Sequence, residues 1–173
     1  MRTRIHRASR ELAASVNYRS AGTVEFVYDP GERQAYFLEM NTRLQVEHPV
    51  TEEVYSVDLV EWMLRLACAG TDGQGGLDPA VFDSDPRPQG AAVEARVYAE
   101  DPDKNSAPCP GTVTGAEFPE TGTSGGVRVR VDGWIETGQE ISHYYDPMIA
   151  KVIVHAGSCL LYTSPSPRDS TSS

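Results

Sequence analysis

Polar and apolar residues alternate along residues 37–48, whose sequence is Phe-Leu-Glu-Met-Asn-Thr-Arg-Leu-Gln-Val-Glu-His. An extended strand points successive side chains to opposite faces, so this stretch would carry one row of polar groups. The row consists of Glu39, Asn41, Arg43, Gln45 and Glu47. Carboxylates and an amide offer oxygen ligands to a divalent cation, while an arginine offers hydrogen-bond donors to an anion. The row therefore predicts a site that holds a metal ion and an anion together.

A further acid, Glu25, lies in the strand predicted just before this stretch, and an Asp-Pro-Gly-Glu sequence between the two is typical of a tight turn. If Asp29 faces Ala35 across that turn, antiparallel pairing places Glu25 opposite Glu39. Two adjacent carboxylates repel each other unless a cation lies between them. The two acids and Asn41 are therefore candidate ligands for Mg²⁺ or Mn²⁺. The alternative is a half-exposed hairpin whose acids face water.

Composition limits the possible partners. The chain of 173 residues carries 25 acidic and 15 basic residues, a net charge of -10. This balance argues against nucleic acid or an anionic membrane as a partner, because both select for clustered Lys and Arg. No apolar run approaches the length of a membrane span. The three cysteines, Cys68, Cys109 and Cys159, match no zinc or disulfide spacing, so a reducing cytoplasmic environment is expected.

In the first half of the chain, the spacing of apolar residues predicts one helix before the polar row and one after it. An entry helix is expected over residues 5–16, followed by the hairpin and a break at His48-Pro49. Capping side chains at 56–58 predict a second helix with an ion pair between Glu61 and Arg65. Its buried face should consist of Leu59, Val60, Met63, Leu64 and Ala67.

The second half of the chain has the pattern of strands. After a loop-rich stretch up to about residue 90, strands are expected at 91–99, 111–118, 127–131 and 149–155. The expected fold class is therefore mixed α/β (α+β). From residue 158 the chain is dominated by Ser, Thr and Pro, a composition that cannot build a core. Residues 158–173 are therefore interpreted as a non-native, disordered tail.

Three motifs carry a resemblance to a known family. The sequence Glu-Met-Asn-Thr-Arg-Leu-Gln-Val-Glu-His-Pro-Val-Thr-Glu at 39–52 closely resembles the signature of biotin carboxylases, the ATP-grasp component of biotin-dependent carboxylases. Val-Glu-Ala-Arg-Val-Tyr-Ala-Glu-Asp at 93–101 and Tyr-Tyr-Asp-Pro-Met-Ile-Ala-Lys at 144–151 resemble downstream motifs of that family, in the same order. The resemblance implies the C-terminal lobe of an ATP-grasp domain at 1–85, followed by part of the biotin carboxylase C-terminal domain at 86–157.

The resemblance implies a role for each residue of the polar row. The metal ligands, which would bind the magnesium or manganese ions that bridge the phosphates of ATP, would be Glu25, Glu39 and Asn41. Bicarbonate would be held by the side chains of Arg43 and Gln45 and by the backbone of Val46. Glu47 would be the base that deprotonates bicarbonate for attack on the γ-phosphate, giving carboxyphosphate.

Arg96, in the second motif, would stabilise the biotin enolate as it takes up CO₂. From the residues alone, an ordinary ion pair between Arg96 and either Glu94 or Glu100 is the favoured interpretation, and the resemblance reverses that preference. His48, before Pro49, is interpreted as a turn or packing residue rather than a proton carrier.

The acceptor of the carboxyl group is less sharply indicated. Segments at 16–23, 60–65, 86–92 and 131–134 look most like the urea carboxylase branch, whereas acyl-CoA carboxylases share the core motifs. Biotin would be carried on another domain or protein, so a biotin carrier domain and a carboxyltransferase domain are expected partners. The resemblance also leaves open a dimeric parent enzyme.

The glycine-rich phosphate loop and ATP-binding lysines of the family would lie upstream of these residues. The chain is therefore expected to be part of a longer C–N bond-forming ligase, truncated at both ends and inactive alone. Two alternatives remain. One is a non-catalytic module derived from the ATP-grasp fold. The other is a different ATP-grasp ligase, such as a carbamoyl-phosphate or purine-pathway enzyme, against which the Gln-Val-Glu-His sequence at 45–48 argues.

Overall fold

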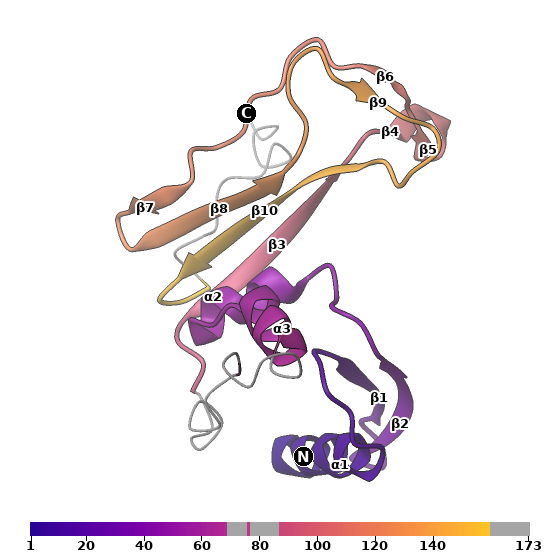
Figure 1. Cartoon of the computed structure of the whole chain (residues 1–173), viewed down its shortest axis with the longest axis vertical. Coiled ribbons are helices and arrows are strands. Elements are labelled where there is room, and N and C mark those ends of the chain that lie inside the picture. Colours follow the sequence, from indigo (N-terminus) through magenta and orange to yellow (C-terminus); the bar gives the residue numbers. More distant parts are fainter. Residues whose placement is uncertain (69–75, 77–86, 160–173) are drawn as a thin grey trace. The chain divides into compact units, whose positions relative to one another are not determined.

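The computed structural model describes residues 1–68, 76 and 87–159 of the chain (Figure 1). Both helices and strands occur along these residues, which confirms the mixed α/β fold class. Most of the loop-rich stretch and of the predicted tail lies outside the described residues. Within the described part of the chain, no helix is long and apolar enough to cross a membrane.

The chain divides into two compact units. Residues 1–48 and 57–86 belong to the first unit, and residues 49–56 and 87–173 belong to the second. A short helical segment just after the polar row is therefore separated from the hairpin before it and belongs with the strands of the second half.

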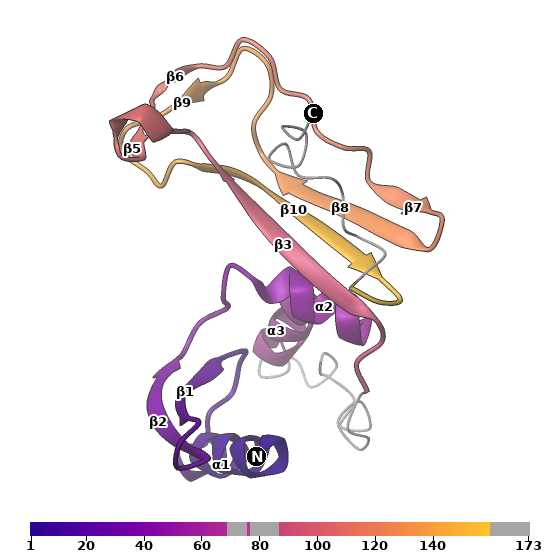
Figure 2. The same ribbon diagram turned by 180° about the vertical axis from the view of Figure 1, so that it is seen from behind.

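The first unit is built on one β-hairpin. Its elements are α1 (Arg2–Ser15), β1 (Thr23–Asp29), β2 (Gln34–Asn41) and α3 (Leu59–Cys68). This confirms the predicted entry helix and hairpin. Figures 1 and 2 both show α1 alongside the hairpin formed by β1 and β2. The turn is stabilised by the Asp29 carboxylate, whose Oδ1 accepts hydrogen bonds from the backbone N–H groups of Gly31 (2.7 Å) and Glu32 (3.1 Å).

Helix α3 forms where the sequence predicts it. Asp58 Oδ1 accepts a hydrogen bond from the Glu61 backbone N–H (2.7 Å), and Glu61 pairs with Arg65 as expected. The predicted burial of its apolar face was wrong, since no residue of α3 is buried and the exposed fractions of Val60 and Leu64 are 42% and 62%. An apolar stripe shows which face a helix can bury, but burial also requires a surface that covers it.

The second unit is built on a four-stranded sheet. Its strands, in spatial order, are β3 (Ala91–Tyr98), β10 (Met148–Ala156), β8 (Val127–Gly133) and β7 (Gly122–Ser124). Both views show β3, β10 and β8 side by side. The neighbouring strands in this order pair antiparallel. The buried apolar side chains of the unit are Ile135, Ile141, Ala150, Ile153 and Ala156.

Short elements complete the second unit. They are α2 (His48–Tyr55), the pair β4 (Glu100–Asp101) and β5 (Ala107–Pro108), the 3₁₀ turn η2 (Pro102–Lys104), and the pair β6 (Gly111–Thr112) and β9 (Glu140–Ile141). Backbone hydrogen bonding continues one residue beyond β6, because the Val113 N–H donates to the Gln139 carbonyl (2.9 Å). The strand predicted over 111–118 is therefore limited to two residues and this continuation.

Candidate functional site

Glu25 of β1 and Glu39 of β2 are paired directly across the hairpin, as the sequence predicts. The route to this register differs from the one expected. Asp29 faces Gln34 rather than Ala35, and this register alone would set Glu25 opposite Leu38. A β-bulge next to Glu25 shifts the pairing by one residue and brings the two glutamates together.

Asn41 joins this pair of acids. Its Nδ2 donates hydrogen bonds to Glu25 Oε1 (2.8 Å) and to Glu39 Oε1 (3.3 Å). Glu25 and Asn41 are half-buried, and Glu39 is exposed. The three predicted metal ligands are thus in contact, at the end of the hairpin where β2 stops.

The chemistry of this set fits a divalent cation. The positive edge of the Asn41 amide now lies between the two carboxylates, the place where a cation would relieve their repulsion. Turning the amide about its last side-chain bond would exchange Nδ2 for Oδ1, so that three oxygen donors converge. No group of three His, Cys, Asp or Glu side chains among the described residues could hold a metal. The set at the hairpin instead combines two acids with one amide. Such a set matches Mg²⁺ or Mn²⁺, which keep several waters and bind substrate phosphates.

The remaining residues of the polar row do not share one strand face, which corrects the opening prediction. Strand β2 ends at Asn41, residues 42–47 form a loop and turn, and α2 begins at His48. The predicted break at His48-Pro49 is instead the first turn of a helix. Proline suits that position because the first N–H groups of a helix have no intrahelical partner.

Arg43 and Gln45 nevertheless lie together in this loop. Arg43 Nη1 donates to Gln45 Oε1 (3.1 Å) and to the Leu44 carbonyl (3.3 Å). The predicted bicarbonate-binding side chains are therefore adjacent, and the Arg43 side chain is exposed. Val46 is half-buried and Glu47 is exposed on the turn before α2. The roles of these residues stay predictions.

His48 contacts the loop that precedes it. Its backbone N–H donates to the Gln45 carbonyl (3.2 Å), and its ring Nδ1 lies 2.8 Å from the same oxygen. The loop is thereby tied to the first residue of α2, consistent with the predicted packing role.

Arg96 lies on β3 of the second unit. Its Nε is 3.6 Å from Glu94 Oε1, and the exposed fractions of the two side chains are 39% and 4%. The ion pair considered from the sequence is therefore present with Glu94, at a loose distance. Lys151 is directly opposite Arg96 in the sheet and pairs with Asp132 (3.6 Å). The role of Arg96 toward biotin stays a prediction.

Sequence reasoning missed a cluster of charges between α2 and β8 in the second unit. Its members are Glu52 and Glu53 of α2 and Arg128, Arg130 and Asp132 of β8. Hydrogen bonding to Asp132 raises the pKa of Arg130 above its ordinary value, although burial of the guanidinium acts in the opposite direction. The alternation Val-Arg-Val-Arg-Val-Asp at 127–132 could have signalled a charged strand face.

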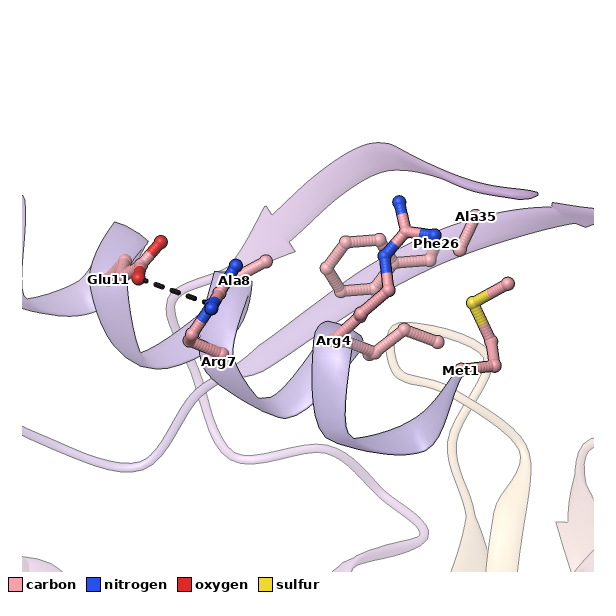
Figure 3. Close-up of a pocket in the computed structure, with 8 residues that line it drawn as sticks. Met1, Arg4, Arg7, Ala8, Glu11, Phe26 and Ala35 are labelled. Atoms are coloured by element: carbon pink, nitrogen blue, oxygen red, sulfur yellow. Dashed lines mark ion pairs between the residues drawn. The ribbon is translucent and has the colours of Figure 1, made fainter.

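A small pocket lies on the other side of the hairpin (Figure 3). Figure 3 shows Phe26 and Ala35 facing α1, where Arg7 and Glu11 form an ion pair of 3.5 Å. Successive side chains of a strand alternate between faces, so Phe26 points away from the face that carries Glu25. The pocket is therefore not part of the acid site.

Family models match both halves of the chain. "Carbamoyl-phosphate synthase L chain, ATP binding domain" matches residues 1–72, and "Biotin carboxylase C-terminal domain" matches residues 94–160. The chain belongs to the biotin carboxylase family. The resemblance seen in the three sequence motifs is confirmed, and the ATP-grasp ligase of another pathway is disfavoured by the second match.

Individual biotin carboxylase relatives agree with this assignment. The putative urea carboxylase of Emericella nidulans is 49% identical over 153 residues, which cover 87% of this chain and 12% of that protein. The crystal structure of the Kluyveromyces lactis urea carboxylase matches with a TM-score of 0.74 and 44% identity, again over 87% of this chain and 12% of that one. The chain thus spans about an eighth of the length of these relatives.

A further biotin carboxylase structure contains bound ligands. The biotin carboxylase domain dimer of the Hydrogenobacter thermophilus 2-oxoglutarate carboxylase was solved in complex with MgADP, ADP and bicarbonate. It matches with a TM-score of 0.68 and 42% identity, and the match covers 84% of this chain and 29% of that one.

Proposed function

We propose that this chain supplies the metal- and bicarbonate-binding part of an ATP-dependent ligase that carboxylates biotin, and that urea is the acceptor of the carboxyl group. The observation that carries the proposal is the contact of Asn41 with the paired acids Glu25 and Glu39. In a hairpin whose acids only faced water, repulsion would turn the two carboxylates apart rather than bring both to one amide.

The three joined side chains would hold Mg²⁺ or Mn²⁺ with the phosphates of ATP. The bound cation would supply positive charge against the charge of the transferring phosphoryl group. Glu25 and Glu39 contribute two negative charges to that task and Asn41 a neutral oxygen. In this proposal, these three side chains would set where the phosphates of ATP lie.

The loop that follows would hold bicarbonate. The guanidinium of Arg43 presents paired donors that suit a planar anion, and its contact with Gln45 limits its freedom. The Val46 backbone would complete the site. Glu47 would accept the bicarbonate proton, so that a bicarbonate oxygen bonds to the γ-phosphorus while the bond to ADP breaks, giving carboxyphosphate. Arg96 would stabilise the negative oxygen of the biotin enolate that receives CO₂.

The whole protein would need further domains for this reaction. A biotin carrier domain would deliver biotin, and a carboxyltransferase domain would pass the carboxyl group to urea. A dimeric, cytoplasmic enzyme is part of this proposal. The similarity to urea carboxylases supports urea over an acyl-CoA as the acceptor.

A bicarbonate-dependent ATPase assay tests the reaction. The full-length protein in which this chain occurs should release phosphate from MgATP only when bicarbonate and biotin are supplied, and urea should accelerate the turnover while acyl-CoA thioesters should not. Glu47→Gln should lower the rate by at least about a hundredfold because the base is lost. A wild-type protein without bicarbonate-dependent ATP hydrolysis would refute the proposed activity.

Mn²⁺ titration of the 173-residue chain tests the metal site separately. Glu25→Gln should weaken Mn²⁺ binding, followed by electron paramagnetic resonance, by at least about tenfold. Glu32→Gln is the matched control, because Glu32 lies in the turn at the other end of the same hairpin. Equal loss of Mn²⁺ affinity in both variants would assign the binding to general negative charge.

A further inference from the structure

Helix α2 carries two buried acids that the proposed reaction does not use. Glu52 and Glu53 have side chains that are each only 5% exposed. Removing a carboxylate from water is costly unless a positive partner compensates its charge. In the second unit that partner comes from β8, where Arg130 and Arg128 face the helix.

Arg130 makes the tightest of these contacts. Its Nη1 donates to Glu52 Oε2 (2.8 Å), while its Nε and Nη2 donate to the two oxygens of Asp132 (2.7 and 2.8 Å). The bidentate contact with Asp132 fixes the plane of the guanidinium and aims its third donor at Glu52. Arg128 adds a looser contact, with Nε 3.3 Å from Glu53 Oε2.

Three contacts hold α2 on the second unit. The first is the Glu52–Arg130–Asp132 triad, and the second is the looser pair of Glu53 with Arg128. The third is the Val54 carbonyl, which accepts a hydrogen bond from the Gln89 N–H (2.8 Å) just before β3. A helix of two turns has little intrinsic stability in water, so its place depends on such contacts.

The first residue of α2 is tied to the proposed bicarbonate loop. His48 contacts the Gln45 carbonyl through both its backbone N–H and its ring, and Glu47 immediately precedes it. The proposed base and the proposed anion ligand Gln45 therefore lie within three residues of the start of α2.

We propose that Arg130 is a positioning residue for bicarbonate activation: by binding Glu52 it holds α2 against β8 and thereby sets the place of Glu47 and Gln45. The inference rests on the function proposed above. Arg130 touches neither substrate nor metal in this scheme and acts only through α2.

The sheet extends the same triad toward Arg96. Asp132 also pairs with Lys151 (3.6 Å), and Lys151 is directly opposite Arg96 on β3. The clamp on α2 and the strand that carries the proposed biotin-contacting arginine therefore share one row of charges. A substitution in this row should impair the activation of bicarbonate more than the other steps, because the reaction of a small anion depends most strongly on exact positioning.

Steady-state kinetics of the full-length protein test this inference. Arg130→Lys keeps a positive charge but cannot bind Asp132 and Glu52 in the same fork, so the KM for bicarbonate should rise about ten- to a hundredfold. The KM for MgATP should change by less than about twofold, because the metal ligands lie on the hairpin before the loop. Guanidinium ion at a low, non-denaturing concentration should restore part of the loss in Arg130→Ala.

Two comparisons keep the test decisive. Glu136→Gln, at an exposed position of the same unit, should leave both KM values unchanged. Hydrogen exchange of the α2 amides, measured on the same samples, reports whether the helix has loosened. Faster exchange with an unchanged KM for bicarbonate would make the triad purely structural and overturn the inference. Absence of bicarbonate-dependent ATP hydrolysis in the wild type would instead overturn the proposed function and this inference with it.

Discussion

The Glu52→Gln substitution isolates the contribution of charge to the contact between α2 and β8. Glutamine has the size of glutamate and keeps a carbonyl oxygen that can accept from Arg130, so no cavity is created. What changes is one negative charge on a side chain that is 5% exposed, 2.8 Å from the Arg130 guanidinium. The variant therefore tests whether a buried ion pair stabilises the second unit.

The expected loss follows from the geometry. At 2.8 Å and an effective dielectric constant of about 20, the gross attraction is about 6 kcal/mol. Dehydration of the carboxylate offsets most of this attraction in the folded state. Asp132 keeps its two hydrogen bonds to Arg130 in the variant, so the guanidinium retains a negative partner. The free energy of unfolding should therefore fall by about 2 kcal/mol, the part of the charge attraction that dehydration does not offset.

Urea unfolding followed by tryptophan fluorescence measures this loss. The chain has two tryptophans, and Trp134 lies in the same unit as Glu52. A Trp62→Phe background therefore leaves Trp134 as the reporter of that unit. The midpoint should fall by about 1 M urea in Glu52→Gln.

Glu136→Gln makes the same chemical change at an exposed position of the unit and should alter the free energy of unfolding by less than about 0.5 kcal/mol. Indistinguishable midpoints for the two variants would refute the reasoning that links burial of Glu52 to stability.

Two further predictions concern backbone features. Gly90→Ala should destabilise the second unit by about 3 kcal/mol, because the backbone φ of +67° disfavours a side chain and a Cβ would lie 2.2 Å from the Ala156 carbonyl oxygen. Gly138→Ala, at φ +93° with open space, should cost only about 1 kcal/mol, and equal thermal shifts would contradict the role of the clash. Asp58→Ala removes the cap on the Glu61 N–H and should lower the stability of the first unit by about 1 kcal/mol in urea unfolding, whereas Asp58→Asn, which keeps a capping oxygen, should not.

The acid pair was predictable from sequence because its residues are close along the chain. Glu25 and Glu39 are separated by one short turn, so strand period and turn composition suffice to place them near each other. The assumed pairing of Asp29 with Ala35 was nevertheless wrong by one residue, and the bulge beside Glu25 compensates for that error. The polar–apolar alternation of this sequence does not reveal the bulge. The pairing of Glu25 with Glu39 was predicted correctly because the one-residue error in the turn register and the unpredicted bulge cancel.

The end of strand β2 was not predictable in the same way. Alternation continues from Asn41 to Glu47, yet the backbone leaves the strand because a helix begins at His48 and the paired strand β1 begins at Thr23, opposite Asn41. A polar alternation is therefore evidence for a strand only as far as another strand can pair with it. The adjacency of Arg43 and Gln45 survives because residues two apart can also meet in a loop.

The charged cluster on α2 shows the opposite limit. Arg130 and Glu52 are 78 residues apart, and each by itself has the pattern of a solvated charge on a strand or a helix. Only the fold reveals that both are removed from water, and burial is what turns an ordinary pair of charges into a specific contact. A charge pattern alone would place both residues on the surface, where their loss would cost little. A local motif can therefore suggest which groups react, whereas a buried contact between residues far apart along the chain becomes visible only in the fold.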